Sequence, residues 1–308
     1  MYLVVLLFAL FASTFAFQKE ILTFSAPFFS VGFRMSLAGI LLLAWAISTK
    51  QTTKIKLAHI KHLTSLTLLN IYITNICEIW GIKYMGAAKT CLMYSLSPFV
   101  TALIAFIVLK ETLSPKKWLG LAIGFIGALP ILFIQTQQEF RSGKILIFSF
   151  AEIAMLFGIL CNVYGWIILK KILKDYHYSP IFANGISMLF GGILALMHSF
   201  FTGEVWAPIP VTHLQPFLIN TIIVCLISNI IAYNLYGVLL KRFSATFMSL
   251  AGLITPVFAS LFAFIFFREI ISWHYFTAML LFTIGLKVFH QEELIHNKLP
   301  TNQTTAKP

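Results

Sequence analysis

Three ionisable side chains lie inside long apolar stretches of the sequence: Arg34, Glu78 and Glu152. An ionisable group at the centre of a membrane helix costs at least ~2.5–3.5 kcal/mol, so it marks a functional site by default. Two carboxylates against one guanidinium leave a formal surplus of negative charge, which favours a site for a cation or ammonium group, or a proton-coupling group. Two other interpretations stay open: Arg34 pairs with one glutamate and only locks helices together, or the charges reach the membrane surface on their flexible stems.

A polar stripe runs along one predicted helix, where Thr74, Asn75 and Glu78 share a face. A second predicted helix has a similar stripe, formed by Asn229, Tyr233 and Tyr236. The two helices are related by an internal repeat, so we expect both stripes to face one central cavity that binds a substrate. The alternative is that these side chains only form hydrogen bonds between neighbouring helices.

Prolines in the middle of two apolar stretches predict paired kinks. Pro98 deprives the carbonyl of Tyr94 of its helical donor, and Pro256 does the same to Gly252. We expect both prolines to act as hinges, with unwound carbonyls facing the cavity. Tyr94 is also a candidate binding residue, and weaker aromatic and amide candidates are Trp80, Asn162 and Trp166.

The sequence repeats itself after about half its length. Residues that match at an offset of 158 positions include Pro98 with Pro256, Lys110-Glu111 with Arg268-Glu269, and Gly127 with Gly285. Such self-similarity indicates two fused copies of one unit. The predicted boundaries are 1–140 for the first copy, 141–289 for the second, and 290–308 for a disordered cytoplasmic tail.

The composition is typical of an all-α integral membrane protein. Of 308 residues, 59% are hydrophobic and only 10% are charged, which suits helices whose solvent is lipid. The net charge of +12 does not indicate nucleic-acid binding, because the basic residues lie in short tracts between apolar stretches. Ten transmembrane helices are predicted, over 2–17, 29–47, 63–82, 88–109, 118–134, 145–169, 181–201, 217–240, 245–267 and 273–288.

The basic residues also predict the orientation of the chain. If both termini are cytoplasmic, 15 of the 22 lysines and arginines lie on the cytoplasmic side, as the positive-inside rule requires. Lys19, Lys83 and Lys89 are among those assigned to outer loops. Because each copy has five spans, the two copies are expected to insert with opposite orientations, as two inverted five-helix repeats.

These motifs together resemble the drug/metabolite transporter superfamily, in its EamA-type ten-helix branch. The resemblance covers essentially the whole chain and rests on Gly86-Ala87-Ala88, Leu96-Ser97-Pro98, Lys110-Glu111, Trp118-Leu119-Gly120, the arginine-bearing Gly32-Phe33-Arg34, and the weaker second copy with Thr255-Pro256, Arg268-Glu269 and Gly285. It implies a secondary transporter for a small organic metabolite. Substrates vary within the superfamily, and some relatives in intracellular bacteria carry S-adenosylmethionine.

The sequence thus favours a carrier that works by alternating access, with an amine-bearing substrate such as an amino acid or S-adenosylmethionine. An exporter of drugs or other metabolites is the main alternative, and a channel or a polytopic membrane enzyme is a weaker one. We expect no catalytic residues, no metal and no cofactor. The expected location is the bacterial inner membrane, and Gly120 and Gly124 could form the face of a homodimer.

Overall fold

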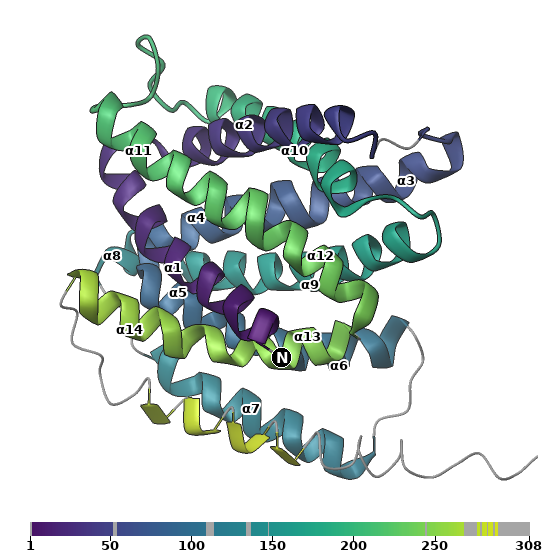
Figure 1. The fold of residues 1–308 in the computed structure, drawn as a ribbon. Helices are drawn as coiled ribbons and strands as arrows, with labels where there is room; N and C mark the ends of the chain where they lie inside the picture. Colours follow the sequence, from purple (N-terminus) through teal and green to yellow (C-terminus); the bar gives the residue numbers. More distant parts are fainter. Residues whose placement is uncertain are drawn as a thin grey trace, which may run out of the picture.

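A computed structural model describes residues 2–51, 54–108, 114–133, 137–146, 148–243, 245–267 and, within 276–288, all but 278, 282 and 286. Nearly all of them are helical (Figure 1). The elements are α1 (Tyr2–Phe24), α2 (Pro27–Ser48), α3 (Leu57–Ser65), η1 (Leu66–Ile73), α4 (Thr74–Met85), α5 (Ala87–Met93), η2 (Tyr94–Leu96), α6 (Ser97–Val108), α7 (Pro115–Phe133), α8 (Gln137–Phe140), β1 (Lys144–Ile145), β2 (Phe148–Ser149), α9 (Phe150–Lys174), α10 (Pro180–Phe201), α11 (Leu214–Val224), η3 (Cys225–Ala232), α12 (Tyr233–Arg242), α13 (Ala245–Ala251), η4 (Gly252–Ile254) and α14 (Thr255–Phe267).

Helices lie over each of the first nine predicted spans. Six helical segments are long and apolar enough to cross a membrane, at 2–24, 27–48, 87–104, 150–174, 180–201 and 214–242. The tenth span, 273–288, lies partly outside the described residues, as do Lys110-Glu111, Arg268-Glu269 and the tail 290–308. The chain is therefore a multi-pass helical membrane protein.

Some predicted boundaries were wrong, and the observed boundaries change where charged residues lie. α1 continues to Phe24, so Lys19 lies in a helix rather than in a loop, and the connection to α2 is only Ser25 and Ala26. The predicted span at 145–169 begins later, because the two-stranded hairpin β1–β2 occupies its first residues and α9 starts at Phe150. Hydrophobicity alone does not distinguish an apolar hairpin from the first turn of a helix.

The order of elements repeats along the chain. The series α5, η2 and α6 begins at Ala87, Tyr94 and Ser97, and the series α13, η4 and α14 begins 158 positions later in each case. Two π-helical stretches also correspond, η1 in the first half and η3 in the second. The second residue of the helix after each stretch donates back into it: Asn75 donates to Ile71 O and Asn234 donates to Ile230 O, at 2.8 Å in both cases. The repeat seen in the sequence is thus a repeat of backbone conformation.

Helices α2 and α10 pack closely against each other, side by side in Figure 1. Their glycines allow the backbones to touch: Gly39 lies against the backbone of Leu189, and Gly192 lies against that of Ser36. Farther along the pair, Gly32 meets Leu196 and Gly185 meets Leu43. As the residue number rises on α2 it falls on α10, so the two helices run antiparallel.

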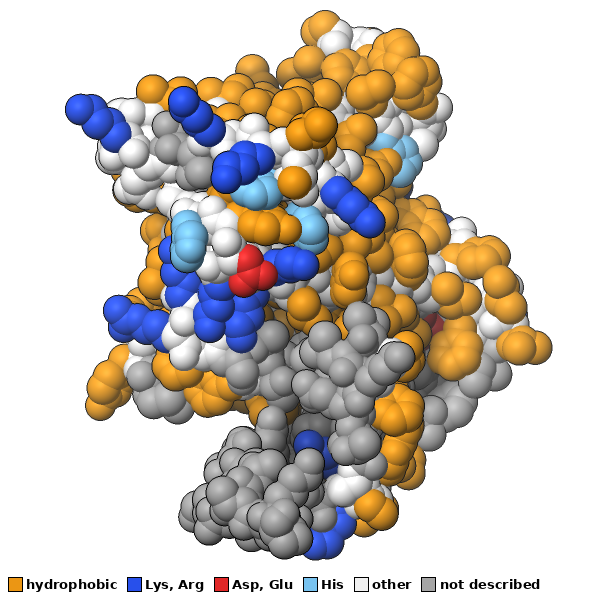
Figure 2. Space-filling view, turned by 90° about the vertical axis from the view of Figure 1, so that its right-hand side faces the viewer, with side chains coloured by type: hydrophobic (Ala, Val, Ile, Leu, Met, Phe, Trp, Pro, Cys, Tyr) orange, Lys and Arg blue, Asp and Glu red, His pale blue; other side chains and the backbone are white. Residues whose placement is uncertain are grey.

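The surface carries a broad apolar area and one basic end. Figure 2 shows hydrophobic side chains over much of one face, with Lys, Arg and His side chains gathered at one edge. These belong to the end of the molecule that includes α3 and the end of α9, where Lys56, Lys61, Lys171 and Lys174 are exposed. The apolar area suits contact with lipid, whereas the basic end suits an aqueous surface beside anionic headgroups.

At the basic end, aromatic and histidine side chains connect α3 to the loop between α9 and α10. The His59 ring stacks on Tyr176 with ring centroids 3.9 Å apart, and its Nδ1 lies 3.2 Å from the Tyr178 hydroxyl. Tyr176 OH lies 3.2 Å from His62 Nδ1. We call these four residues the inner clasp.

Replacement of Gly192 by alanine should destabilise the fold. A Cβ at this position would lie 2.4 Å from the backbone nitrogen of Ser36, so α2 and α10 would have to separate. Overpacking of this kind costs about 1–3 kcal/mol. Gly81→Ala is the matched control, because its Cβ meets the flexible end of Met85 at 3.1 Å. Thermal unfolding in detergent should show a lower midpoint for Gly192→Ala alone, and equal midpoints would contradict this account of the interface.

The inner clasp should weaken at acidic pH. Burial lowers the pKa of His62, and the neighbouring Lys171 lowers it further. The folded state therefore binds this proton less readily than the unfolded chain, whose histidine pKa is ~6.5. The contribution of His62 to stability is complete above that value and is lost as the pH falls below it. The thermal midpoint of the wild type should drop more steeply than that of His62→Gln between pH 7 and pH 5; parallel profiles would show that His62 is not the sensitive group.

Candidate functional site

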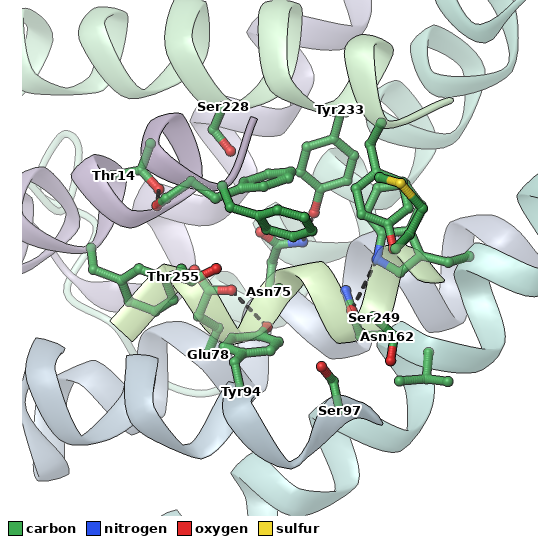
Figure 3. A pocket seen from close by; sticks show the side chains of 18 of the residues that line it. Thr14, Asn75, Glu78, Tyr94, Ser97, Asn162, Ser228, Tyr233, Ser249 and Thr255 are labelled. Carbon is green, nitrogen blue, oxygen red and sulfur yellow. Dashed lines mark hydrogen bonds between the residues drawn. The ribbon is translucent and has the colours of Figure 1, made fainter. Parts of the chain in front are cut away.

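One cavity lies in the middle of the helix bundle (Figure 3). The space between its side chains measures about 900 Å³, including the part open to solvent. Helices from both halves of the chain line it. The lining residues are Phe8, Phe11, Thr14, Phe15, Arg34, Asn75, Glu78, Tyr94, Ser97, Thr101, Asn162, Val163, Trp166, Ser228, Tyr233, Tyr236, Met248, Ser249, Gly252 and Thr255.

One end of the cavity holds two opposite charges. Tyr94 OH donates to Glu78 Oε2 at 2.8 Å, a bond drawn in Figure 3. Gln18, which lies directly behind the lining, donates through Nε2 to Glu78 Oε1 at 2.8 Å. The buried Arg34 donates through Nη2 to Asn75 Oδ1 at 3.1 Å and to Gln18 Oε1 at 3.4 Å. We call Arg34, Gln18 and Glu78 the charged end.

The other end of the cavity is aromatic. Trp166 stacks on Tyr236 with ring centroids 3.9 Å apart and an interplanar angle of 22°. Tyr233 lies 5.2 Å from the Trp166 ring and at an edge-on angle to Phe11. The indole N–H is directed away from the stack, because Trp166 Nε1 donates to Asn162 Oδ1 at 3.0 Å. Flat faces of this kind bind flat ligands and cations.

Helix α1 runs along the cavity and connects its two ends. Phe8 is in edge contact with Tyr236, Phe15 is in edge contact with Tyr94, and Gln18 bonds to Glu78. From Phe8 to Gln18 the helix rises ~15 Å, at 1.5 Å per residue. Hydroxyl groups also line the cavity, namely those of Thr14, Ser97, Thr101, Ser228, Ser249 and Thr255. The cavity is therefore lined by one pair of opposite charges, by aromatic rings and by hydroxyl groups.

The two predicted stripes meet in this cavity. Asn75 Nδ2 lies 3.4 Å from Tyr233 OH, and these two residues are 158 positions apart, the offset of the repeat. Seven of the predicted binding residues line the cavity, namely Arg34, Asn75, Glu78, Tyr94, Trp166, Tyr233 and Tyr236. The weaker candidate Asn162 lines it too, whereas Trp80 lies in a separate hollow beside Lys83 and Tyr84.

Two members of the stripes do not line the cavity. Thr74 donates to Leu69 O at 2.7 Å and packs toward α9, where Gly158 O lies 3.3 Å away. Asn229 is buried beside α2, with its Nδ2 3.1 Å from Met35 Sδ. Thr74 directly follows the π-helical stretch η1 and Asn229 lies within η3. The extra residue in such a turn rotates side chains away from the face that an α-helical count predicts.

Glu152 was placed wrongly in relation to Arg34 and Glu78. It is the third residue of α9 and forms a capping box with Ser149, which accepts from Glu152 N at 3.1 Å. Its Oε1 lies 2.7 Å from Lys89 Nζ, and Lys89 also bonds to Glu139 at 2.6 Å. Lys89, expected in an outer loop, is only 4% exposed. Glu152 therefore belongs to a separate buried ionic cluster with Lys89 and Glu139.

This correction changes the charge of the cavity. Among the described residues that line it, Arg34 and Glu78 are the charged ones, and their formal charges cancel. The predicted surplus of negative charge is therefore absent from this site. A carboxylate and a guanidinium are both available to a ligand.

The prolines lie where the two series of elements break. Pro98 and Pro256 each follow a 3₁₀ turn, η2 and η4. The expectation of unwound carbonyls was wrong, because Tyr94 O accepts from Ser97 N and Gly252 O accepts from Thr255 N within these turns. A 3₁₀ bond replaces the donor that proline removes. Tyr94, Gly252 and Thr255 still reach the cavity.

A comparison with known protein families identifies the fold. The model of the EamA-like transporter family matches residues 1–133 and 149–289. The chain belongs to this family. The resemblance to the drug/metabolite transporter superfamily is thereby confirmed, and the family and its relatives are transporters rather than enzymes.

Named relatives agree with this assignment. The chain is 31% identical over 288 residues to the S-adenosylmethionine/S-adenosylhomocysteine transporter of Chlamydia muridarum, covering 93% of this chain and 88% of that one. It is 30% identical to the protein of the same name from Chlamydia trachomatis serovar L2, covering 93% and 86%. A crystal structure with 16% identity matches the fold with a TM-score of 0.64, over 97% of this chain and 98% of that chain.

Sequence analysis missed one member of the charged end. Gln18 was placed in a loop, because the apolar stretch of the first span ends at Phe17. A signal was present nonetheless: Phe8, Phe11, Phe15 and Gln18 follow the spacing of one helical face, which would have extended the first helix past its apolar stretch.

If Pro98 acts as a hinge, Pro98→Ala should slow transport more than it weakens binding. Alanine allows α5 and α6 to merge into one straight helix and so removes the break at η2. Pro180→Ala is the control, because that proline occupies the first turn of α10 and interrupts no helical bond. Transport rates in proteoliposomes are compared with substrate affinities in detergent. An unchanged rate in Pro98→Ala would make this proline an ordinary tolerated residue.

Proposed function

We propose that this protein is a secondary transporter that carries an amine-bearing metabolite by alternating access, with S-adenosylmethionine and S-adenosylhomocysteine as the foremost candidates. The observation that carries the proposal is the cavity itself. It brings together a stacked Trp166–Tyr236 pair, a half-buried Glu78 carboxylate and several hydroxyl groups. These three kinds of group suit the base, the amino group and the ribose of an adenosyl amino acid.

The chemistry of each kind of group supports this match. An adenine ring gains stacking energy on aromatic side chains, and a sulfonium or ammonium group is attracted to their faces. Ribose hydroxyls exchange hydrogen bonds with serine and threonine. An ammonium group at Glu78 forms a charge-assisted hydrogen bond, which is stronger than a neutral one. The rise of ~15 Å between Phe8 and Gln18 is comparable to the length of a nucleoside joined to an amino acid.

The named relatives support the same substrates, since two of them are called S-adenosylmethionine/S-adenosylhomocysteine transporters. Amino acids without a flat body form the second candidate group within the amine-bearing class. They would use Glu78 but leave the Trp166–Tyr236 stack without a partner. The presence of the stacked Trp166–Tyr236 pair therefore favours an adenosyl compound over a simple amino acid.

The relation between the two halves supports alternating access. The antiparallel course of α2 and α10 supports two inverted five-helix repeats within ten transmembrane helices. Each half contributes residues to the cavity, as the contact between Asn75 and Tyr233 illustrates. Rocking of one half against the other about η2 and η4 would open the cavity to either side in turn. The basic end then faces the cytoplasm, with both termini there, in the inner membrane of a bacterium.

Counterflow in proteoliposomes separates this proposal from its alternatives. Vesicles are loaded with unlabelled S-adenosylhomocysteine and presented with labelled S-adenosylmethionine outside. A carrier accumulates label transiently and saturates with concentration, whereas a channel does neither. Uptake that prefers unrelated drugs over both adenosyl compounds would indicate an exporter of broader range. Failure of both compounds to bind or exchange would contradict the substrate assignment.

Glu78→Gln should weaken binding of the amine-bearing substrate by about tenfold, or ~1.4 kcal/mol. The substitution keeps the shape of the side chain and removes its charge. Glu20→Gln is the matched control, since this glutamate is on α1 but does not line the cavity. Affinities are measured by calorimetry with the purified proteins. Equal affinities for wild type and Glu78→Gln would show that the carboxylate does not contact the substrate.

A further inference from the structure

Gln18 occupies an unusual position for a neutral side chain. It is buried, with 2% of its surface exposed, and it lies between a guanidinium on α2 and a carboxylate on α4. Arg34 and Glu78 make no ion pair within 4.0 Å among the described residues, so the amide is what connects them. One buried amide dipole thus contacts both the buried guanidinium of Arg34 and the half-buried carboxylate of Glu78.

Chemistry determines which way the amide faces. Its oxygen accepts from Arg34 and its NH₂ group donates to Glu78. The reverse orientation would place NH₂ against the guanidinium and oxygen against the carboxylate, where neither contact is a hydrogen bond. The amide therefore presents an acceptor and a donor side by side. The carboxylate and ammonium groups of an α-amino acid present the same pair in the same order, with full charges.

We propose that Gln18 holds the place of an α-amino-acid group, and that a substrate carrying this group displaces it. The substrate carboxylate then takes the position of the amide oxygen at Arg34, and its ammonium takes that of the NH₂ group at Glu78. This inference rests on the proposed function and refines it: the ligand class is a zwitterionic amino acid head rather than an amine alone.

The contacts of Arg34 leave it able to bind a carboxylate. Both of its hydrogen bonds use Nη2, and its other N–H groups make no hydrogen bond within the described part of the chain. A guanidinium that binds a carboxylate through two parallel bonds gains strength and a fixed orientation. Asn75, which accepts from Nη2, holds the side chain in position while Gln18 leaves.

The balance of charge also favours a zwitterion. With Gln18 displaced, a lone amine would neutralise Glu78 but leave the buried Arg34 without an opposite charge, and an anion would leave Glu78 without one. An uncompensated buried charge is strongly unfavourable. A head that carries both charges satisfies both residues and keeps the site neutral. Exchange of contacts between one charge and a neutral amide for contacts between two opposite charges supplies the driving force for displacement.

Binding to the full-length wild-type protein tests this inference without any substitution. Calorimetry compares S-adenosylhomocysteine with its decarboxylated amine, with its deaminated acid and with methylthioadenosine, which lacks the head. Loss of either charged group should weaken binding at least tenfold. Equal binding of the amine would show that the carboxylate is not recognised and would overturn the inference, while the proposed function would stand.

Binding of none of the adenosyl compounds would overturn the proposed function, and the head is then tested with methionine and its two single-charge analogues. If methionine binds and neither analogue does, the result supports recognition of the zwitterionic head without the adenosyl group. If methionine does not bind either, both the proposed function and the inference about the head are overturned.

Gln18→Ala separates displacement from direct contact. If the Gln18 side chain competes with the substrate for Arg34 and Glu78, its removal should leave the affinity for S-adenosylhomocysteine unchanged or raise it. A Gln18 that touches the bound substrate would instead make Gln18→Ala weaken binding, and that result would overturn the displacement. Thr23→Ala is the control, because Thr23 is exposed on the same helix and bonds only to Glu20 O at 2.8 Å. Methylthioadenosine, which lacks the head, should bind both variants as it binds the wild type.

Discussion

The structure depends on how two opposite charges are kept inside an apolar bundle. Arg34 and Glu78 are held by hydrogen bonds from Gln18, Asn75 and Tyr94, on helices that lie far apart in the sequence. Each of these bonds joins two elements, so the two charged groups keep their hydrogen-bond partners only while α1, α2, α4 and η2 keep their places. The site and the centre of the fold are consequently the same set of contacts, which couples occupancy of the site to the arrangement of the helices.

Residues of the site were predictable where they lie on regular α-helix. Asn75 and Glu78, with Tyr233 and Tyr236, were placed by spacing and by the offset of the repeat. The same reasoning failed at Thr74 and Asn229, because π-helical turns shift the face of the helix and the printed letters do not reveal such a turn. Glu152 failed for another reason: Ser149 ends an apolar stretch as an N-cap, so the carboxylate caps a helix instead of entering the membrane interior.

Gln18 and Lys89 show a general limit of hydropathy. Both are polar residues beside an apolar stretch, and a window that counts apolar residues assigns them to loops. In the structure both are buried, since each meets partners from distant parts of the chain, Gln18 at the charged end and Lys89 beside Glu139 and Glu152. Whether a polar side chain is inside depends on its tertiary partners, and one sequence without those partners leaves the choice open.

The two ionic groups of the bundle serve different requirements. In the Lys89 cluster, one ammonium meets two carboxylates directly, and such short contacts stabilise one arrangement of helices. At the charged end the opposite charges are kept apart by a neutral amide that can turn away, so neither charge has its strongest partner. That arrangement suits a site that must release one ligand and bind the next.

Because the charges of Arg34 and Glu78 cancel, only the net charge of the transported substrate would respond to a membrane potential, at ~2.3 kcal/mol per elementary charge per 100 mV. A zwitterionic cargo would follow its concentration gradient alone, and an additional cationic centre on the same cargo would couple its movement to the potential without any change in the protein.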